Sequence, residues 1–329
     1  MASPNKSLAT LRPDLASFLE FDLEAARNGF IAPQVYPIVE VALQSDNPGR
    51  IKLSQLLGDA SLAARASGAS YDEQTYQFQD YQYATRDYGA VERLDERDIQ
   101  RYRHIIDAEL IATQRAFDRV LRSYEKRVAD TVMNTSTWTG SALATSVSNG
   151  WTTNNASTAT PIADIEAAVQ KVRDNCGLAA NTLILPYKAF RQLRLLEEVK
   201  DAVASQGAGS SEAQGNITLQ ILSAVFDIPK ILVGNAQRNT SKNPATSSLA
   251  EIWHADRAMV CVTSDSPDPR NPCIGRTFHW SEDGSNVGGA IEQWYDDDIR
   301  GHKIRVRMES DEKTMYVEAG HLLTGIAAT

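Results

Sequence analysis

The sequence lacks any long hydrophobic run. No stretch of about 20 apolar residues is present, which is the length that a helix needs to cross a bilayer. The N-terminal segment MASPNKSLATLRPDLASF also lacks the continuous apolar core of a signal peptide. These absences predict a protein without a membrane segment that stays in the compartment where it is made.

Cysteine is scarce as well. The three cysteines, Cys176, Cys261 and Cys273, are too few and too scattered for a disulfide framework, and no CxxC pair indicates a zinc site. A reducing cytoplasm fits this usage.

Basic residues are not in excess. The chain has 33 Lys and Arg against 42 Asp and Glu, a formal net charge of −9, and both signs are mixed along its 329 residues. This balance argues against a nucleic-acid-binding module and allows only weak, non-specific contact with DNA.

Motifs for catalysis are missing too. The five histidines form neither HExxH nor His-x-His, no Gly-x-Ser-x-Gly elbow is present, and no Lys-Ser/Thr follows the glycines at 207, 209 and 215. We therefore predict no enzyme activity and no cofactor. In the run Tyr295-Asp-Asp-Asp298, Asp296 and Asp298 share one face of a strand; a metal site is one interpretation, and a solvated or intersubunit charge cluster is the preferred one.

Two segments in the first third of the chain predict extended structures. In FIAPQVYPIVEV, Pro33 and Pro37 remove two backbone donors, which predicts an extended arm and neither a helix nor a central strand. Residues 49–90 predict a long, largely polar two-stranded hairpin whose alternation slips near Asp80, as at a bulge. Such a hairpin is marginal alone and indicates a surface for a partner.

The strongest pattern is that of one long helix. Apolar residues recur at steps of three or four, Asp95 is a good N-cap, and neither Pro nor Gly interrupts the segment before Gly140. A single helix from Asp95 to Met133 would be about 55 to 60 Å long. Such a helix would be longer than the diameter of an ordinary domain, so it must lie across a surface. The apolar stripe consists of Ile99, Tyr102, Ile106, Leu110, Thr113, Phe117, Val120, Tyr124, Val128 and Val132.

The rest of the chain predicts a mixed α+β protein. Residues 134–160 have almost no charge and predict a long loop. We then expect helices at 161–173, 187–199 and 217–226, with strands at 182–185 and 230–233. A mostly antiparallel sheet follows, with turns at 284, 301 and 311–313.

Five pieces of this sequence, in order, resemble the major capsid proteins of tailed bacteriophages, of the lambda-like type. RNGFIAPQVYPIVEV is similar to the end of their N-terminal arm, and SNGWTTNNASTATPIADIEAAVQKV to their Trp, Ser-rich, Pro-Ile helix stretch. ANTLILPYKAFRQLRLLEEVKD and ITLQILSAVFDIPKILVGNA resemble the units that open and close the axial domain, and IWHADRAMVCVTS with GRTFHW resembles the returning sheet. The resemblance covers about residues 28–325; each piece is common, but the order is specific.

The resemblance implies the HK97-like capsid fold. It maps an N-terminal arm to 1–48, an E-loop to 49–94, and the P-domain spine helix with its following loop to 95–160. It also maps an A-domain to 161–235, the P-domain sheet to 236–315, and the A-domain return strand with the C-terminus to 316–329.

The implied function is a virion shell that self-assembles from hexamers and pentamers in the host cytoplasm and encloses double-stranded DNA. The implied partners are further copies of the chain, a separate scaffold protein, a portal protein and decoration proteins. Some members of the fold cross-link subunits through an E-loop lysine, and Lys52 is the only lysine of this E-loop. The expected intersubunit residues are Arg50, Lys52, Tyr76, Tyr81, Tyr83 and Arg86 on the hairpin, facing a neighbour's Glu96 or Asp296 to Asp298.

Two alternatives of different classes remain open at this point. An encapsulin-type compartment resembles the same fold but encloses enzymes, although the arm of some 48 residues and the polar hairpin favour the virus. An α/β enzyme built on residues 161–235 is the other alternative, and it lacks a catalytic constellation.

Overall fold

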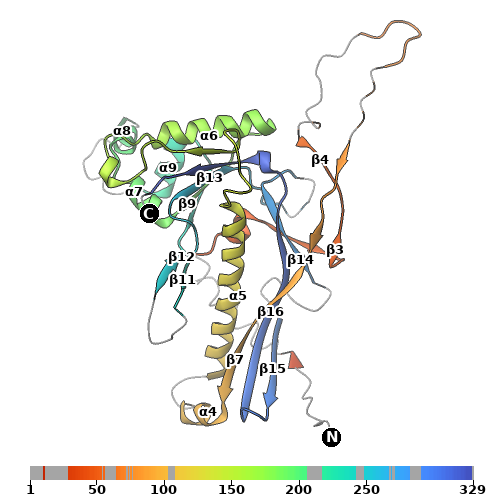
Figure 1. Ribbon diagram of the computed structural model, residues 1–329, viewed down its shortest axis with the longest axis vertical. Helices are drawn as coiled ribbons and strands as arrows, with labels where there is room; N and C mark the ends of the chain where they lie inside the picture. The colour runs from red at the N-terminus through yellow and green to blue at the C-terminus, as the bar shows by residue number, and fades with distance from the viewer. Residues whose placement is uncertain are drawn as a thin grey trace.

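The computed structural model describes residues 10–11, 29–53, 55, 64–71, 73, 75, 77–102, 108–205, 217–241, 248–266, 268, 271–281 and 290–327. In that part of the chain the protein has two main sheets, one long helix beside the first sheet and a group of helices around the second (Figure 1). None of the helices described there combines the length and the apolar character that spanning a bilayer requires.

The first sheet is elongated and mostly antiparallel. Its strand order is β1 (Thr10–Leu11), β15 (Ala290–Asp296), β16 (Gly301–Thr314), β14 (Gly275–Trp280) and β2 (Ile38–Val41), and β7 (Arg86–Asp95) pairs with β16 along its other edge. β16 is therefore the central strand, because it pairs with β7 over residues 301–310 while β15 and then β14 pair with its opposite side.

One predicted turn is wrong in this sheet. Residues 311–313 lie inside β16, where they pair with 276–278 of β14, instead of forming a turn. Their charges have partners far away in the sequence: Asp311 accepts the Ala84 N–H at 2.9 Å, and Glu312 pairs with Arg127 at 2.8 Å. The β15–β16 turn consists of residues 297–300 and leads directly into Gly301. Residue 284 lies outside the described residues.

Helix α5 (Ala108–Val132) packs along this sheet, against β16 and β7 (Figure 1). The predicted apolar stripe is confirmed from Thr113 onward, because Thr113, Phe117, Val120, Tyr124, Val128 and Val132 are all buried. Its 25 residues span about 37 Å.

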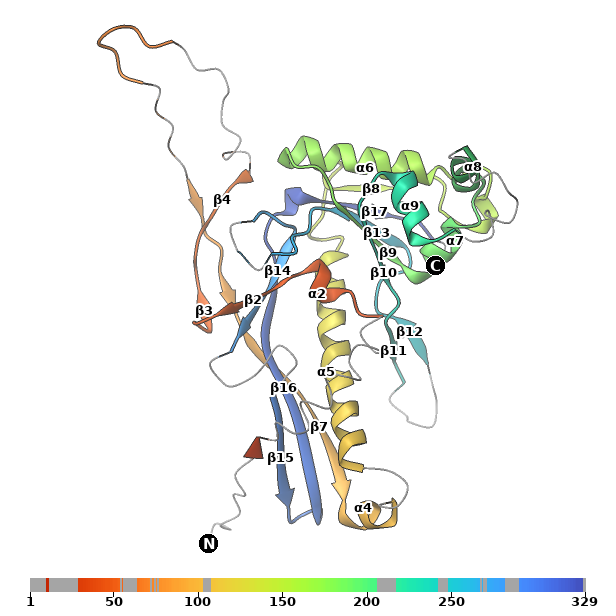
Figure 2. The ribbon, with the colours of Figure 1, turned by 180° about the vertical axis from the view of Figure 1, so that it is seen from behind.

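The prediction of a single helix from Asp95 is wrong. A separate helix, α4 (Glu96–Tyr102), lies across the end of α5 and contacts it (Figure 2). Asp95 caps α4 as expected, since its carboxylate accepts the Arg97 N–H at 2.8 Å. Apolar spacing indicates which face of a helix is buried, but it does not give the direction of the helix axis. Periodicity alone therefore did not reveal the change of direction between α4 and α5.

The second sheet forms the core of the region with most of the helices. Its order is β10 (Lys230–Gly234), β9 (Thr182–Pro186), β13 (Arg257–Cys261), β17 (Gly320–Thr324) and β8 (Ala144–Ser146). The helices around it are α6 (Pro161–Cys176), α7 (Tyr187–Leu193), α8 (Glu197–Ser205) and α9 (Leu219–Phe226), and short 3-10 turns occur at Thr153–Asn155 and Val317–Ala319. The predicted helix at 187–199 is two helices, because the Glu197 N–H bonds to the Ala156 carbonyl at 3.0 Å and so leaves the helical pattern.

The predicted arm segment is partly helical. Residues Ala32–Val35 form the one-turn helix α2, in which Pro33 is tolerated because first-turn N–H groups need no helical acceptor. β2 then pairs in parallel with β14 at the edge of the first sheet, in keeping with the expectation that it is not a central strand.

The predicted hairpin is present as two short ladders that rise away from the body (Figure 1). β3 (Ser45–Asp46) pairs with β6 (Tyr83–Ala84), and β4 (Arg50–Ile51) pairs with β5 (Phe78–Gln79). Between the ladders the Asn47 side chain accepts the Tyr81 N–H at 2.8 Å and donates to Asp80 at 3.2 Å. The pairing is thus interrupted near Asp80, as the slipped alternation predicts. A further small pair, β11 (Gln237–Asn239) with β12 (Leu249–Glu251), lies beside α5 (Figures 1 and 2).

Candidate assembly surfaces

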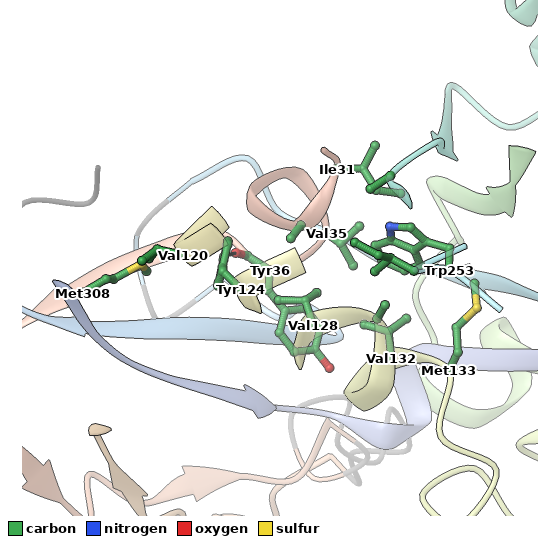
Figure 3. Packing of buried hydrophobic residues seen from close by; sticks show 14 of the residues in the cluster. Ile31, Val35, Tyr36, Val120, Tyr124, Val128, Val132, Met133, Trp253 and Met308 are labelled. Atoms are coloured by element: carbon green, nitrogen blue, oxygen red, sulfur yellow. Dashed lines mark hydrogen bonds between the residues drawn. The ribbon is translucent and has the colours of Figure 1, made fainter. Parts of the chain in front are cut away.

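A buried carboxylate holds the start of the arm segment on α5. Both oxygens of Glu125 accept backbone N–H groups, from Ile31 and Ala32 at 2.9 Å each, and Oε1 also accepts the indole N–H of Trp253 at 2.7 Å. Glu125 has no exposed surface, and burial raises the pKa of its carboxyl. Figure 3 shows Trp253 beside Ile31 and Val35, next to the α5 residues Val128 and Val132. Three separate parts of the chain therefore meet at one side chain.

A second polar link ties α5 to the central strand β16. Arg127 donates to both carboxylate oxygens of Glu312, at 2.9 and 2.8 Å, and to Ser310 at 3.1 Å. Its guanidinium also lies 3.6 Å from the centre of the Tyr88 ring on β7. This two-pronged geometry fixes the rotation of α5 on the sheet.

Sequence reasoning missed Glu125, Arg127 and Trp253. A usable signal existed for Glu125, because Leu121, Glu125, Val128 and Val132 continue the three-and-four spacing of the apolar stripe. An acidic residue on that stripe requires buried donors. Its donors come from residues 94 and 128 positions away in the sequence, so they could not be named from local patterns.

The base of the projecting hairpin is an aromatic cluster. Tyr83 stacks on Phe278 with ring centres 4.6 Å apart, and Tyr81 lies at 6.0 Å from the same ring. Both tyrosines are buried within their own chain. Arg50 lies over the rings of Tyr81 and Tyr316, at 5.6 and 5.4 Å.

The expected hairpin contacts therefore divide into inner and outer residues. Tyr81 and Tyr83 serve the interior, because aromatic rings at this base gain more from packing on Phe278 than from water. Lys52 and Arg86 are exposed, Arg50 is half-buried, and Tyr76 lies outside the described residues. The described outer part at residues 64–71 is exposed throughout and ends in a turn at Gly68, where φ is +88°.

The expected acidic residues come together at the opposite end of the first sheet, which we call the sheet tip: residues 95–98 and 296–301. The Glu96 N–H bonds to the Arg300 carbonyl at 3.2 Å, which joins the start of α4 to the β15–β16 turn. Asp298 and Glu96 are exposed. Asp296 instead pairs with Lys303 in its own chain, and this hydrogen bond holds the pKa of the Asp296 carboxyl below its usual range.

A chemical site is not evident in the described part of the chain. Those residues contain no group of three or more His, Cys, Asp or Glu arranged to hold a metal. The three cysteines are buried and unpaired, and burial raises the pKa of each thiol. His321 is also buried and bonds to the Ala142 carbonyl at 2.9 Å, a structural role.

The chain is similar to known proteins in sequence and in fold. No family model matches the sequence. The major capsid protein of Burkholderia phage BcepMu is 24% identical over 230 residues, and the match covers 66% of this chain and 66% of that protein's length.

Solved structures match over much more of the chain. A phage-related protein from Bordetella bronchiseptica superposes with a TM-score of 0.70 at 19% identity, covering 98% of this chain and 99% of its own. The capsid protein of cyanophage P-SCSP1u gives a TM-score of 0.56 at 11% identity, covering 88% of this chain and 86% of its own. An encapsulin from Synechococcus elongatus gives 0.52 at 10% identity, covering 99% and 92%. The chain thus has the HK97-like fold that the phage capsid and encapsulin structures share.

Proposed function

We propose that this chain is the major capsid protein of a tailed phage and that its hexamers and pentamers form the icosahedral shell around double-stranded DNA. The observation that carries the proposal is the likeness to phage capsid proteins, which covers 66% of the chain in sequence and 88% of it in fold. In the virion, this subunit supplies the wall of the head.

The subdomain map predicted from the sequence gives each region a task in that shell. Residues 49–94 act as the E-loop, α5 is the spine of the P-domain, and residues 161–235 belong to an A-domain that meets its copies at a symmetry axis. Support comes from the division of the body into two separate sheets, with α5 on the first and most helices around the second, and from the projection of the hairpin away from both (Figure 1). In the described outer part, residues 64–71 are all exposed, and exposed residues of a projecting hairpin gain burial from another molecule.

Neighbouring subunits make head-to-tail contacts in this proposal. The hairpin offers Arg50, Lys52 and Arg86, and the sheet tip of a neighbour offers Glu96 and Asp298. The two surfaces lie at opposite ends of β7 and its continuation into β6 (Figure 1). A contact between two different surfaces of one subunit can generate the closed rings that capsomers require, provided that the rotation between neighbours closes. Each exposed ion pair contributes under about 1 kcal/mol, so strength comes from repetition by symmetry.

Assembly further involves a separate scaffold protein and a portal, with decoration proteins on the outside. These partners follow from the family resemblance. Lys52 is exposed and so available for cross-linking to a neighbour.

An encapsulin-type compartment is the second candidate, since an encapsulin shares the fold. The content of purified particles separates the two functions. Particles from infected or induced cells should contain double-stranded DNA and no stoichiometric enzyme. Packaged ferritin-like or peroxidase proteins, identified by mass spectrometry, would overturn the phage assignment.

A further inference from the structure

An open groove of about 750 Å³ lies between α5 and the β11–β12 pair, which run side by side in both views (Figures 1 and 2). The groove is held together across the gap by Arg122, whose guanidinium donates to the Gln237 carbonyl. Among the described residues, ten line the groove, of which five are cations and one is an acid. They are Arg119, Arg122, Ser123, Lys126, Arg127, Asp130, Gln237, Arg238, Asn239 and Leu249.

Three of these cations form a stripe on one face of α5. Arg119, Arg122 and Lys126 are spaced by three and four residues, so their side chains project in the same direction about 5 to 6 Å apart. Arg238 faces them from β11. A concentration of positive charge is unusual here, because the whole chain carries a net charge of −9.

The stripe keeps donors available for a ligand. Arg119 contacts Glu92 at 3.2 Å, Arg122 contacts Asp118 at 2.7 Å, and Lys126 contacts Asp130. These side chains remain 61%, 41% and 32% exposed, so the pairs are solvated and weak, and each cation has further N–H groups to offer.

The other two cations of the groove, Arg238 and Arg127, differ in whether they already pair with an acid. Arg238 forms no ion pair with any residue in the described part of the chain. Arg127 is committed to Glu312 and is only 18% exposed, so it belongs to the packing of α5.

The uncharged lining residues indicate the kind of partner. Ser123, Gln237 and Asn239 are side chains that, together with Arg and Lys, make most protein contacts to nucleic-acid phosphates. Among the described residues that line the groove there is no aromatic ring to stack a base, and Leu249 is the single apolar one. Protein interfaces are centred on well-packed, desolvated pockets, whereas this groove is open and its paired cations stay in contact with solvent.

We propose that this groove contacts the phosphate backbone of duplex DNA and therefore faces the interior of the shell. The proposal rests on the proposed function, and it identifies which surface of the subunit contacts the packaged DNA. At most four cations take part, and three of them, Arg119, Arg122 and Lys126, first loosen a pair with an acid of their own chain. The contact is consequently weak, independent of base sequence and sensitive to salt, which lets DNA slide during filling.

The test measures binding of the full-length chain, before shell assembly, to a fluorescent 30-base-pair duplex across a range of salt concentrations. With four phosphate contacts, the logarithm of the association constant should fall with the logarithm of salt with a slope of about −3.6. The variant Arg119→Gln/Lys126→Gln/Arg238→Gln retains Arg122 and its bond to Gln237, and its slope should be about −0.9.

A matched control removes three exposed cations elsewhere. Lys171→Gln/Arg173→Gln/Arg191→Gln changes α6 and α7 and should keep the wild-type slope. Equal slopes in both triple variants, or no binding by the wild type at 50 mM salt, would overturn the proposal. Displacement of the duplex by an equal charge of polyglutamate would reassign the groove to an acidic protein segment. Electron microscopy of the groove variant distinguishes failure of the two proposals. Shell formation tests the capsid function, and the salt dependence of DNA binding tests the groove.

Discussion

The carboxylate of Glu125 accepts the indole N–H of Trp253 at 2.7 Å, and neither side chain has exposed surface. The same carboxylate accepts the N–H groups of Ile31 and Ala32, at the start of α2. In the described structure Glu125 has no cation beside it; three N–H donors compensate for its burial. The start of α2, helix α5 and the segment leading to β13 thus share one polar contact inside an apolar core.

Glu125→Gln tests this contact without changing the shape of the side chain. The amide NH2 must face a backbone N–H, which leaves buried donors unpaired, and the free energy of unfolding should fall by about 2 kcal/mol. Urea denaturation of the unassembled subunit measures the loss. Asp118→Asn changes a half-buried side chain of α5 that pairs only with the next turn; it is the control and should cost less than about 0.5 kcal/mol. Equal stability of Glu125→Gln and wild type would show that the contact contributes nothing.

The pH dependence of stability should report the same carboxyl. Burial raises the pKa of Glu125 in the folded state above its value of 4.5. A raised folded pKa means that the folded chain binds the Glu125 proton more tightly than the unfolded chain does. The contribution of this proton binding to the free energy of unfolding is therefore complete below pH 4.5 and is lost as pH rises through the folded pKa. The advantage of wild type over Glu125→Gln should therefore shrink toward neutral pH. An advantage that grew from pH 4.5 to 7 would contradict the raised pKa.

Local signals predicted the elements that depend on local sequence. α6 begins at Pro161 and ends before Gly177, which adopts a φ of +72°, and both residues are standard boundary signals. The strands at 182–186 and 230–234 were visible as short apolar runs.

The predictions from sequence were wrong where a hydrogen-bond or ion-pair partner far away in the sequence determines the local structure. The helix at 187–199 breaks because the Glu197 N–H finds the Ala156 carbonyl, and residues 311–313 stay in β16 because Ala84 and Arg127 pair with them. The candidate contacts show the same limit. Sequence identified the aromatic residues of the hairpin, but burial of Tyr81 and Tyr83 on Phe278 depends on a strand almost 200 positions later.

Gly301 should be irreplaceable at the sheet tip. An added Cβ would meet the Leu94 backbone carbonyl well inside van der Waals contact, and a strand backbone cannot move aside cheaply. Gly301→Ala should lower the free energy of unfolding by about 2 kcal/mol or more. Gly29→Ala is the matched control, because nothing lies within 4 Å of its added Cβ, and it should change stability by less than about 1 kcal/mol. Similar thermal unfolding of the two variants would refute the steric argument.

Charge reversal on the hairpin should weaken assembly without unfolding the subunit. Lys52 and Arg86 are exposed, so Lys52→Glu/Arg86→Glu should leave the melting temperature within a few degrees of wild type. The fraction of chain in sedimenting particles should fall about tenfold at low salt, because each lost pair is repeated around the shell. Adding Glu96→Lys/Asp298→Lys should restore part of it. Unchanged assembly at both low and raised salt would exclude this pairing.

Electron microscopy of the expressed chain tests the central claim most directly. A subunit with a projecting hairpin and the HK97-like fold should form closed shells or tubes built from repeated capsomers. Image reconstruction should place the hairpin of each subunit on a neighbour. A population of monomers that stays dispersed at high concentration, also with its scaffold protein present, would contradict the account.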